Sequence, residues 1–135
     1  MASILKVDTL TGVTTAGSIS VTGEGNSTTT NLQQGLAKAW HSLDGDAGTP
    51  VFFDSFNCAS ILDTAAGKPQ VNFTNAMSND DFSVGLTSGE TAGAAQSFGS
   101  NTPKTTSSVI YKTMNSSFSA TDSTNVDGIV MGDLA

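Results

Sequence analysis

The sequence lacks arginine and is poor in positive charge. Its 135 residues contain five lysines against twelve acidic residues, which gives a formal net charge of −7. So few cations cannot neutralise a run of phosphates, and we therefore expect no nucleic-acid partner. Anionic membrane surfaces are disfavoured for the same reason.

Cysteine and long apolar runs are also scarce. The single cysteine, Cys58, excludes an intramolecular disulfide, so stability has to come from packing or from assembly. No apolar stretch approaches the roughly 18 to 20 residues that cross a bilayer, and residues 1–8 lack the basic and apolar regions of a signal peptide. We expect no membrane insertion, and synthesis in a cytoplasm.

Groups that could carry catalysis or bind a metal are few. His41 is the only imidazole, and we interpret it as a strand residue beside Trp40 rather than as a general base. Cys58 is interpreted as a small buried hydrophobe at the start of a strand. One histidine and one cysteine cannot supply the three or four ligands of a zinc site within one subunit. We predict no catalytic residue, no metal site and no cofactor, hence no enzyme, unless a trimer brings three copies of His41 together.

The residues that are abundant favour β structure. Thr, Val, Ile and Phe suit a pleated surface, Ser disfavours helix interiors, and 14 glycines supply turns. Apolar runs recur every 10 to 12 residues and predict an all-β, antiparallel, jelly-roll-like β-sandwich over residues 32–135. The predicted strands are 37–43, 51–53, 58–63, 70–73, 82–87, 107–112, 117–120 and 128–131. The predicted core residues are Trp40, Phe52, Phe73, Phe82, Ile110 and Ile129, and Phe53, Phe56 and Phe118 are also assigned to core packing.

Two connecting segments interrupt the strand pattern. Residues 31–39 hold the only helix-compatible stretch, in which Asn31 is a plausible N-cap and Gly35 limits the helix to about one turn. The segment Ser88 to Thr106 is rich in Gly, Ala, Ser and Thr and is predicted to be a long surface loop, a common location for a binding function.

Residues 1–31 form a separate N-terminal arm. They contain no aromatic residue and hold two alternating β-type runs, 4–10 and 18–22. A strand pair of this length cannot bury a core alone, so three copies around an axis, or another protein, would have to cover its apolar side chains. The predicted attachment and trimer contacts are Ile4, Leu5, Val7, Leu10, Ile19 and Val21.

The order of these motifs resembles one protein family. Residues 4–10 and 17–25 resemble the N-terminal arm of fibre-like or decoration proteins on the virions of marine tailed phages, including cyanophages. Residues 36–40, 54–57, 60–61 and 70–77 resemble the domain that follows in those proteins. The resemblance covers about residues 4 to 86. It implies a homotrimeric, β-rich protein on the virion exterior, whose arm attaches to the particle.

Two functions follow from this resemblance. The first is a non-enzymatic capsid fibre or decoration protein that is attached to capsid or tail proteins through its arm. The alternative is a tail fibre or appendage whose domain binds a host-surface glycan or calcium. In the alternative, the segment Ser88 to Thr106 or the acidic turns Asp44–Asp46 and Asp80–Asp81 would bind the ligand, although these turns lack the alternating series of a calcium loop.

Overall fold

The computed structural model describes residues 4–12, 19–22, 29–89, 96–97 and 103–135, and the statements below concern these residues. The chain divides into two compact units, Met1–Leu36 and Ala37–Ala135. The division falls after Leu36, whereas the sequence placed it after residue 31. Each unit is described by itself.

The first unit holds a strand pair and one helical turn. Strand β1 (Ser20–Thr22) pairs antiparallel with β2 (Thr29–Asn31), and α1 (Leu32–Gly35) follows directly. The Oδ1 atom of Asn31 accepts a hydrogen bond from the backbone N–H of Gln34 at 3.2 Å, which confirms the predicted N-cap. Among the described residues, no helix is both long and apolar enough to cross a membrane.

The predicted strand at residues 4–10 is wrong. Residues 4–12 contain no strand, and β1 pairs with residues 29–31, which were not predicted to be extended. The physical reason is loop closure: β2 follows β1 after a short Gly-containing segment, so a local antiparallel pair forms at low entropic cost. Part of the second predicted run, residue 18, lies outside the described residues.

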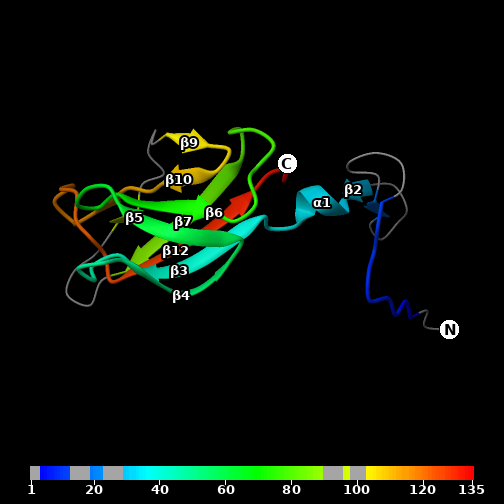
Figure 1. Ribbon diagram of the computed structural model, residues 1–135, viewed down its shortest axis with the longest axis horizontal. Coiled ribbons are helices and arrows are strands. Elements are labelled where there is room, and N and C mark those ends of the chain that lie inside the picture. The colour runs from blue at the N-terminus through cyan, green and yellow to red at the C-terminus, as the bar shows by residue number, and fades with distance from the viewer. Residues whose placement is uncertain (1–3, 13–18, 23–28, 90–95, 98–102) are drawn as a thin grey trace. The chain divides into compact units, whose positions relative to one another are not determined.

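The second unit is built from two four-stranded antiparallel sheets that pack together, as predicted for an all-β sandwich (Figure 1). The first sheet has the order β4-β3-β12-β7. Its strands are β3 (Ala39–Asp44), β4 (Val51–Phe56), β7 (Ser83–Gly89) and β12 (Asn125–Met131). The second sheet has the order β5-β6-β10-β9. Its strands are β5 (Cys58–Asp63), β6 (Pro69–Phe73), β9 (Lys104–Thr105) and β10 (Ser108–Ile110).

A smaller strand pair and a turn complete this unit. Strand β8 (Gln96–Ser97) pairs with β11 (Thr113–Met114). The predicted strand at 117–120 is wrong, because the Oδ1 atom of Asn115 accepts hydrogen bonds from the N–H groups of Ser117 and Ser119, both at 3.0 Å. These bonds close a turn in which Phe118 has a positive φ of 60° and an exposed side chain, so Phe118 is not a core residue.

The core lies between the two sheets. Phe73 from β6 packs edge-on against Phe82, with ring centroids 5.7 Å apart, and both are buried as predicted. Phe52 is partly buried against the core, and Ile110 is half-buried. The buried apolar residues are Ala39, Leu43, Val71, Phe73, Met77, Phe82, Val109, Tyr111, Val126 and Val130.

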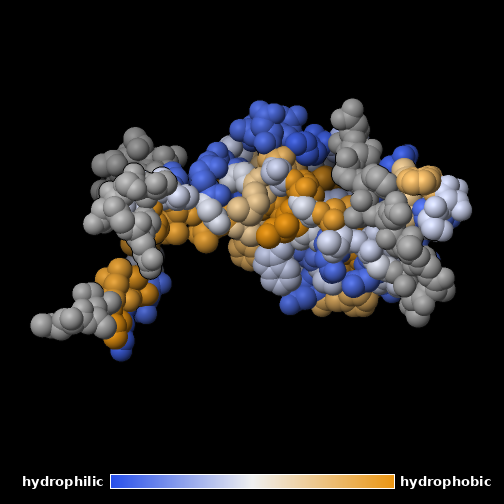
Figure 2. All heavy atoms as spheres, turned by 180° about the vertical axis from the view of Figure 1, so that it is seen from behind, coloured by the Kyte–Doolittle hydropathy of each residue, from blue (hydrophilic) through white to orange (hydrophobic). Residues whose placement is uncertain are grey.

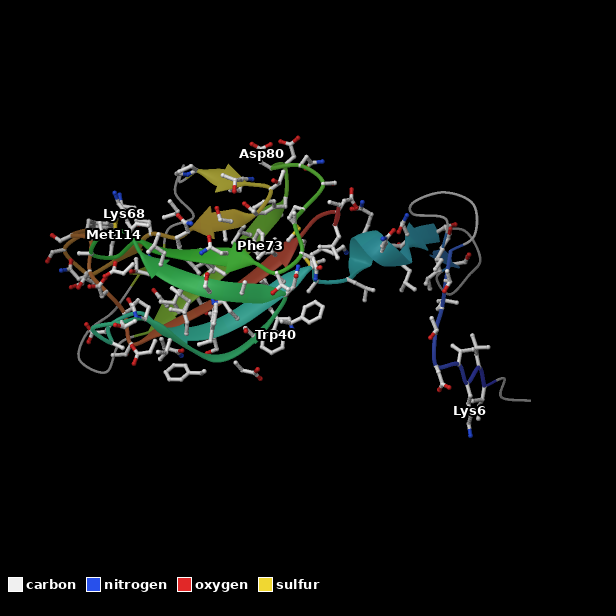
Figure 3. The ribbon with its side chains drawn as sticks, in the orientation of Figure 1. Lys6, Trp40, Lys68, Phe73, Asp80 and Met114 are labelled. Atoms are coloured by element: carbon white, nitrogen blue, oxygen red, sulfur yellow. The ribbon has the colours of Figure 1, made fainter. Side chains whose placement is uncertain are left out.

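Trp40 and Ile129 are not core residues, contrary to the prediction. In β3 the inward positions are Ala39, His41 and Leu43, so alternation directs Trp40 outward. In β12, Val126, Gly128 and Val130 face inward, which directs Ile129 outward. Figure 3 shows Trp40 on the outer side of the sheet, whereas Phe73 lies between the layers. Phe53 and Phe56 are also exposed.

Gly67 is required at the turn between β5 and β6. Its φ is +67°, and an added Cβ would lie 2.5 Å from the Thr113 carbonyl oxygen and 2.7 Å from the Thr121 nitrogen. We expect Gly67→Ala to lower the free energy of unfolding by about 3 kcal/mol, since strain and backbone overlap add together. Urea denaturation measures this loss. The matched control is Gly48→Ala, where nothing lies within 4 Å of the added Cβ, and equal losses in the two variants would contradict the assignment.

Candidate functional site

The first unit exposes the apolar side chains that the sequence assigned to attachment. Ile4, Leu5, Val7, Leu10 and Val21 are all exposed, and Ile19 is half-buried. The space-filling view shows orange apolar atoms at the surface of this unit (Figure 2). None of the described residues between 4 and 36 is buried. The structure therefore describes no hydrophobic core in this unit.

Water contact of these side chains has a free-energy cost that a partner would remove. Each large aliphatic side chain that passes from water into an interface contributes roughly 1.5 kcal/mol or more. The backbone of the unit is locally ordered even so. The Ile19 carbonyl accepts a hydrogen bond from Leu32 N–H at 2.9 Å and joins β1 to α1. The first unit thus offers an apolar contact segment, next to a small hydrogen-bonded element.

The second unit contains a polar cluster in its core. His41 is 3% exposed, and its ring lies 5.0 Å from the Tyr111 ring and 6.2 Å from the Phe52 ring, measured between centroids. Neither imidazole nitrogen nor the Tyr111 hydroxyl has a hydrogen-bond partner among the described residues. A Cβ added at Gly128 would overlap His41 Nε2, so glycine makes room for the ring.

Burial sets the protonation of this cluster. Burial lowers the pKa of His41 to about 4, and the Val126 backbone and the Asp127 carboxylate oppose this shift only weakly. The Val126 backbone approaches the ring without reaching the geometry of a hydrogen bond. Burial also raises the pKa of the Tyr111 hydroxyl well above its usual range. Since the ring is enclosed between the sheets of its own chain, three copies of His41 cannot meet unless the sandwich opens.

Cys58 is half-buried at the first position of β5. Its Sγ atom contacts the carbonyl oxygens of Trp40 at 3.5 Å and Phe56 at 3.4 Å. Burial raises the pKa of the Cys58 thiol to about 11, so the sulfur is a neutral thiol at pH 7. Neither His41 nor Cys58 carries a charge at neutral pH, and both act as packing groups in this arrangement.

Local hydrogen bonds close the two acidic turns. Asp44 Oδ1 accepts hydrogen bonds from the N–H groups of Asp46 at 3.0 Å and Ala47 at 3.2 Å. Asn79 Oδ1 accepts one from Asp81 N–H at 2.9 Å. Within the part of the chain that the structure describes, no three His, Cys, Asp or Glu side chains gather where they could hold a metal ion.

The predicted loop from Ser88 to Thr106 is partly strand. Ser88 and Gly89 end β7, residues 96–97 form β8, and Lys104 and Thr105 form β9. Residues 90–95 and 98–102 lie outside the described residues, so the glycan- or calcium-binding interpretation of this segment stays a prediction.

Sequence reasoning missed one surface, the outer face of the sheet β4-β3-β12-β7. Phe56, Trp40 and Ile129 are directly paired across three strands and are 51%, 38% and 45% exposed. We call these three residues, two aromatic side chains and the aliphatic Ile129, the aromatic row. The next outward position on each strand is polar; these residues, called the polar row, are Asp54, Ser42, Asp127 and Thr87. The signal was available in the sequence. Ala39 and Leu43 occupy alternate positions of β3, and Trp40 shares the opposite face with the polar residues Ser42 and Asp44.

Comparison with protein-family models, curated proteins and solved structures returns no match, so the function has to be argued from the geometry of the chain.

The burial of His41 predicts a pH-dependent stability. The unfolded chain protonates His41 near the ordinary pKa of 6.5, whereas the folded chain does so only near 4. Because the unfolded chain binds this proton more readily, protonation of His41 lowers the free energy of unfolding. The loss begins as the pH falls below 6.5 and reaches about 3 kcal/mol near pH 4. Urea denaturation between pH 7 and 4.5 should show this loss, and His41→Phe should flatten the slope. Identical slopes in the two proteins would contradict the assignment.

Proposed function

We propose that this chain is a non-enzymatic structural protein of a tailed-phage virion, a trimeric capsid fibre or decoration protein. In this proposal the first unit attaches the protein to capsid or tail proteins, and the β-sandwich of the second unit faces outward. The observation that carries the proposal is the first unit: its described residues include exposed apolar side chains and no buried residue. Such a segment is stabilised by assembly rather than by its own fold.

The contrast between the two units supports attachment at the N-terminal side. The second unit has a continuous buried core between two sheets, the arrangement on which an ordinary β domain relies for stability. The exposed apolar residues of the first unit are concentrated in a short stretch, Ile4 to Leu10. A threefold axis lets one such stretch meet two identical copies at once, which buries more apolar surface for each chain than one pairwise contact.

The ordered motifs of the sequence support the virion assignment. The resemblance to fibre-like proteins of marine tailed phages spans both the arm and much of the sandwich, residues 4 to 86. An all-β fold is consistent with that resemblance. The charge of −7 favours solubility of an exterior protein at high local concentration.

The solution mass tests the trimer. We expect the full chain to sediment as a trimer of 13.7-kDa subunits at micromolar concentration, and residues 37–135 alone to sediment as a folded monomer. Replacement of Ile4, Leu5 and Val7 by Ser should dissociate the trimer, because it removes the apolar contacts. The matched control replaces the neighbouring polar residues Lys6 and Thr9 by Ser. A full chain that is monomeric would overturn the trimer.

The location on a particle requires a separate experiment. Purified phage particles whose genome encodes this chain should contain it, and an antibody raised against residues 37–135 should label intact particles. The protein should be absent from particles when residues 1–36 are deleted, although the deleted form still folds. Particles without the chain, or particles that still bind the truncated form, would overturn attachment through the first unit.

A further inference from the structure

The outer face of the sheet β4-β3-β12-β7 places the aromatic row directly beside the polar row. Trp40 is paired with Phe56 on one side and with Ile129 on the other. Two residues further along the strands, Ser42 is paired with Asp54 and Asp127. Adjacent strands are about 4.8 Å apart and alternate residues about 7 Å apart, so the aromatic row is about 10 Å long, the polar row is about 14 Å long, and the two rows lie about 7 Å apart.

This area suits a small occupant. A stable protein–protein interface buries about 800 Å² on each partner, far more than three partly exposed side chains supply. Beyond Ile129 the aromatic row ends at Gly85, which has no side chain to extend it. The aromatic row is therefore large enough for one or two rings of a ligand and is by itself too small for a globular partner, although β4 also exposes Val51 and Phe53.

The charge of the face excludes anions. Asp54 and Asp127 contribute two carboxylates, and none of the outward positions in the two rows is a lysine. A second copy would bring the same carboxylates to the contact and would be repelled. The occupant is consequently neutral or positive.

The hydrogen-bonding pattern distinguishes these two possibilities. The polar row alternates carboxylates, which only accept, with the hydroxyls of Ser42 and Thr87, which both donate and accept. Ser42 Oγ donates weakly to Asn125 Oδ1 at 3.4 Å and can still accept. A ligand whose groups each donate and accept matches the whole row. An ammonium or guanidinium group only donates, so it could pair with the carboxylates but could not accept from the exposed Thr87 hydroxyl, which would stay hydrogen-bonded to water.

We propose that this face binds a neutral sugar ring of a glycan chain. The apolar C–H face of the ring would stack on the Trp40 indole and contact Phe56, because an aromatic face is electron-rich and attracts polarised C–H groups. Hydroxyl groups at the ring edge would donate to Asp54 and Asp127. The inference goes beyond the proposed assembly, since every residue involved lies in the second unit and none lies in the arm.

Trp40 is the only tryptophan in the chain and therefore reports on its own site. The full chain is titrated at pH 7 with neutral hexasaccharides of glucose, galactose and mannose in α and β linkages, and both tryptophan fluorescence and binding heat are recorded. We expect a saturable fluorescence change with at least one of them. In calorimetry, Trp40→Ala should weaken this binding at least tenfold, Trp40→Phe should weaken it less, and Asp127→Asn should weaken it severalfold.

The control is Phe118→Ala, which removes an exposed phenylalanine from a turn outside this face and should leave binding unchanged. Far-UV circular dichroism confirms that each variant is folded.

The proposal is overturned if no hexasaccharide binds at about 10 mM, or if binding survives Trp40→Ala. An octalysine peptide tests a cationic ligand in the same titration, and binding of this peptide alone at Trp40 would also overturn the proposal. Loss of self-association in Trp40→Ala would overturn it as well, because the face would then be a contact between copies of the chain. The mass of the full chain remains a separate result, so failure here leaves the trimer test intact.

Discussion

The strand β12 is the constraint on which the second unit depends. It pairs with β3 on one side and with β7 on the other, so it lies in the interior of its sheet. Its register fixes which side chains face the core: Val130 is buried and Ile129 is exposed. A shift by one residue would exchange these two environments and would also move Gly128 away from His41. The buried polar cluster and the aromatic row thus follow from one set of strand pairs.

The two units differ in how far their apolar side chains are shielded from water. In the second unit the two sheets cover each other, so its buried residues come from both layers. In the first unit, a three-residue strand pair and a one-turn helix have too little area to cover anything. The same chain therefore combines a unit with a buried core and a unit whose described residues leave their apolar side chains exposed.

Much of the sandwich could be predicted from the sequence, because apolar runs and turn residues are both local signals. The strand Cys58–Asp63 is one example, since Asn57 and the turn before Pro69 mark its ends. Strands of two residues, such as β9, leave no periodic signal and were missed. The aromatic row was missed for another reason: Trp40 was assigned to the core for its size, although the alternation of its neighbours decides its direction. The exposed arm residues could be named from the sequence, but the lack of a strand over residues 4–12 could not.

The position of β12 between β3 and β7 also bears on how fast the second unit folds. The hairpins β3–β4 and β5–β6 join neighbouring segments, and a growing chain can form them early. The pairs between β3 and β12, such as Trp40 with Ile129, join opposite ends of the unit. Loop-closure entropy opposes such contacts until most of the sandwich is in place, and chains dominated by them belong to the slow-folding class. We therefore expect the pairing of β12 with β3 to be a late step in the folding of the second unit.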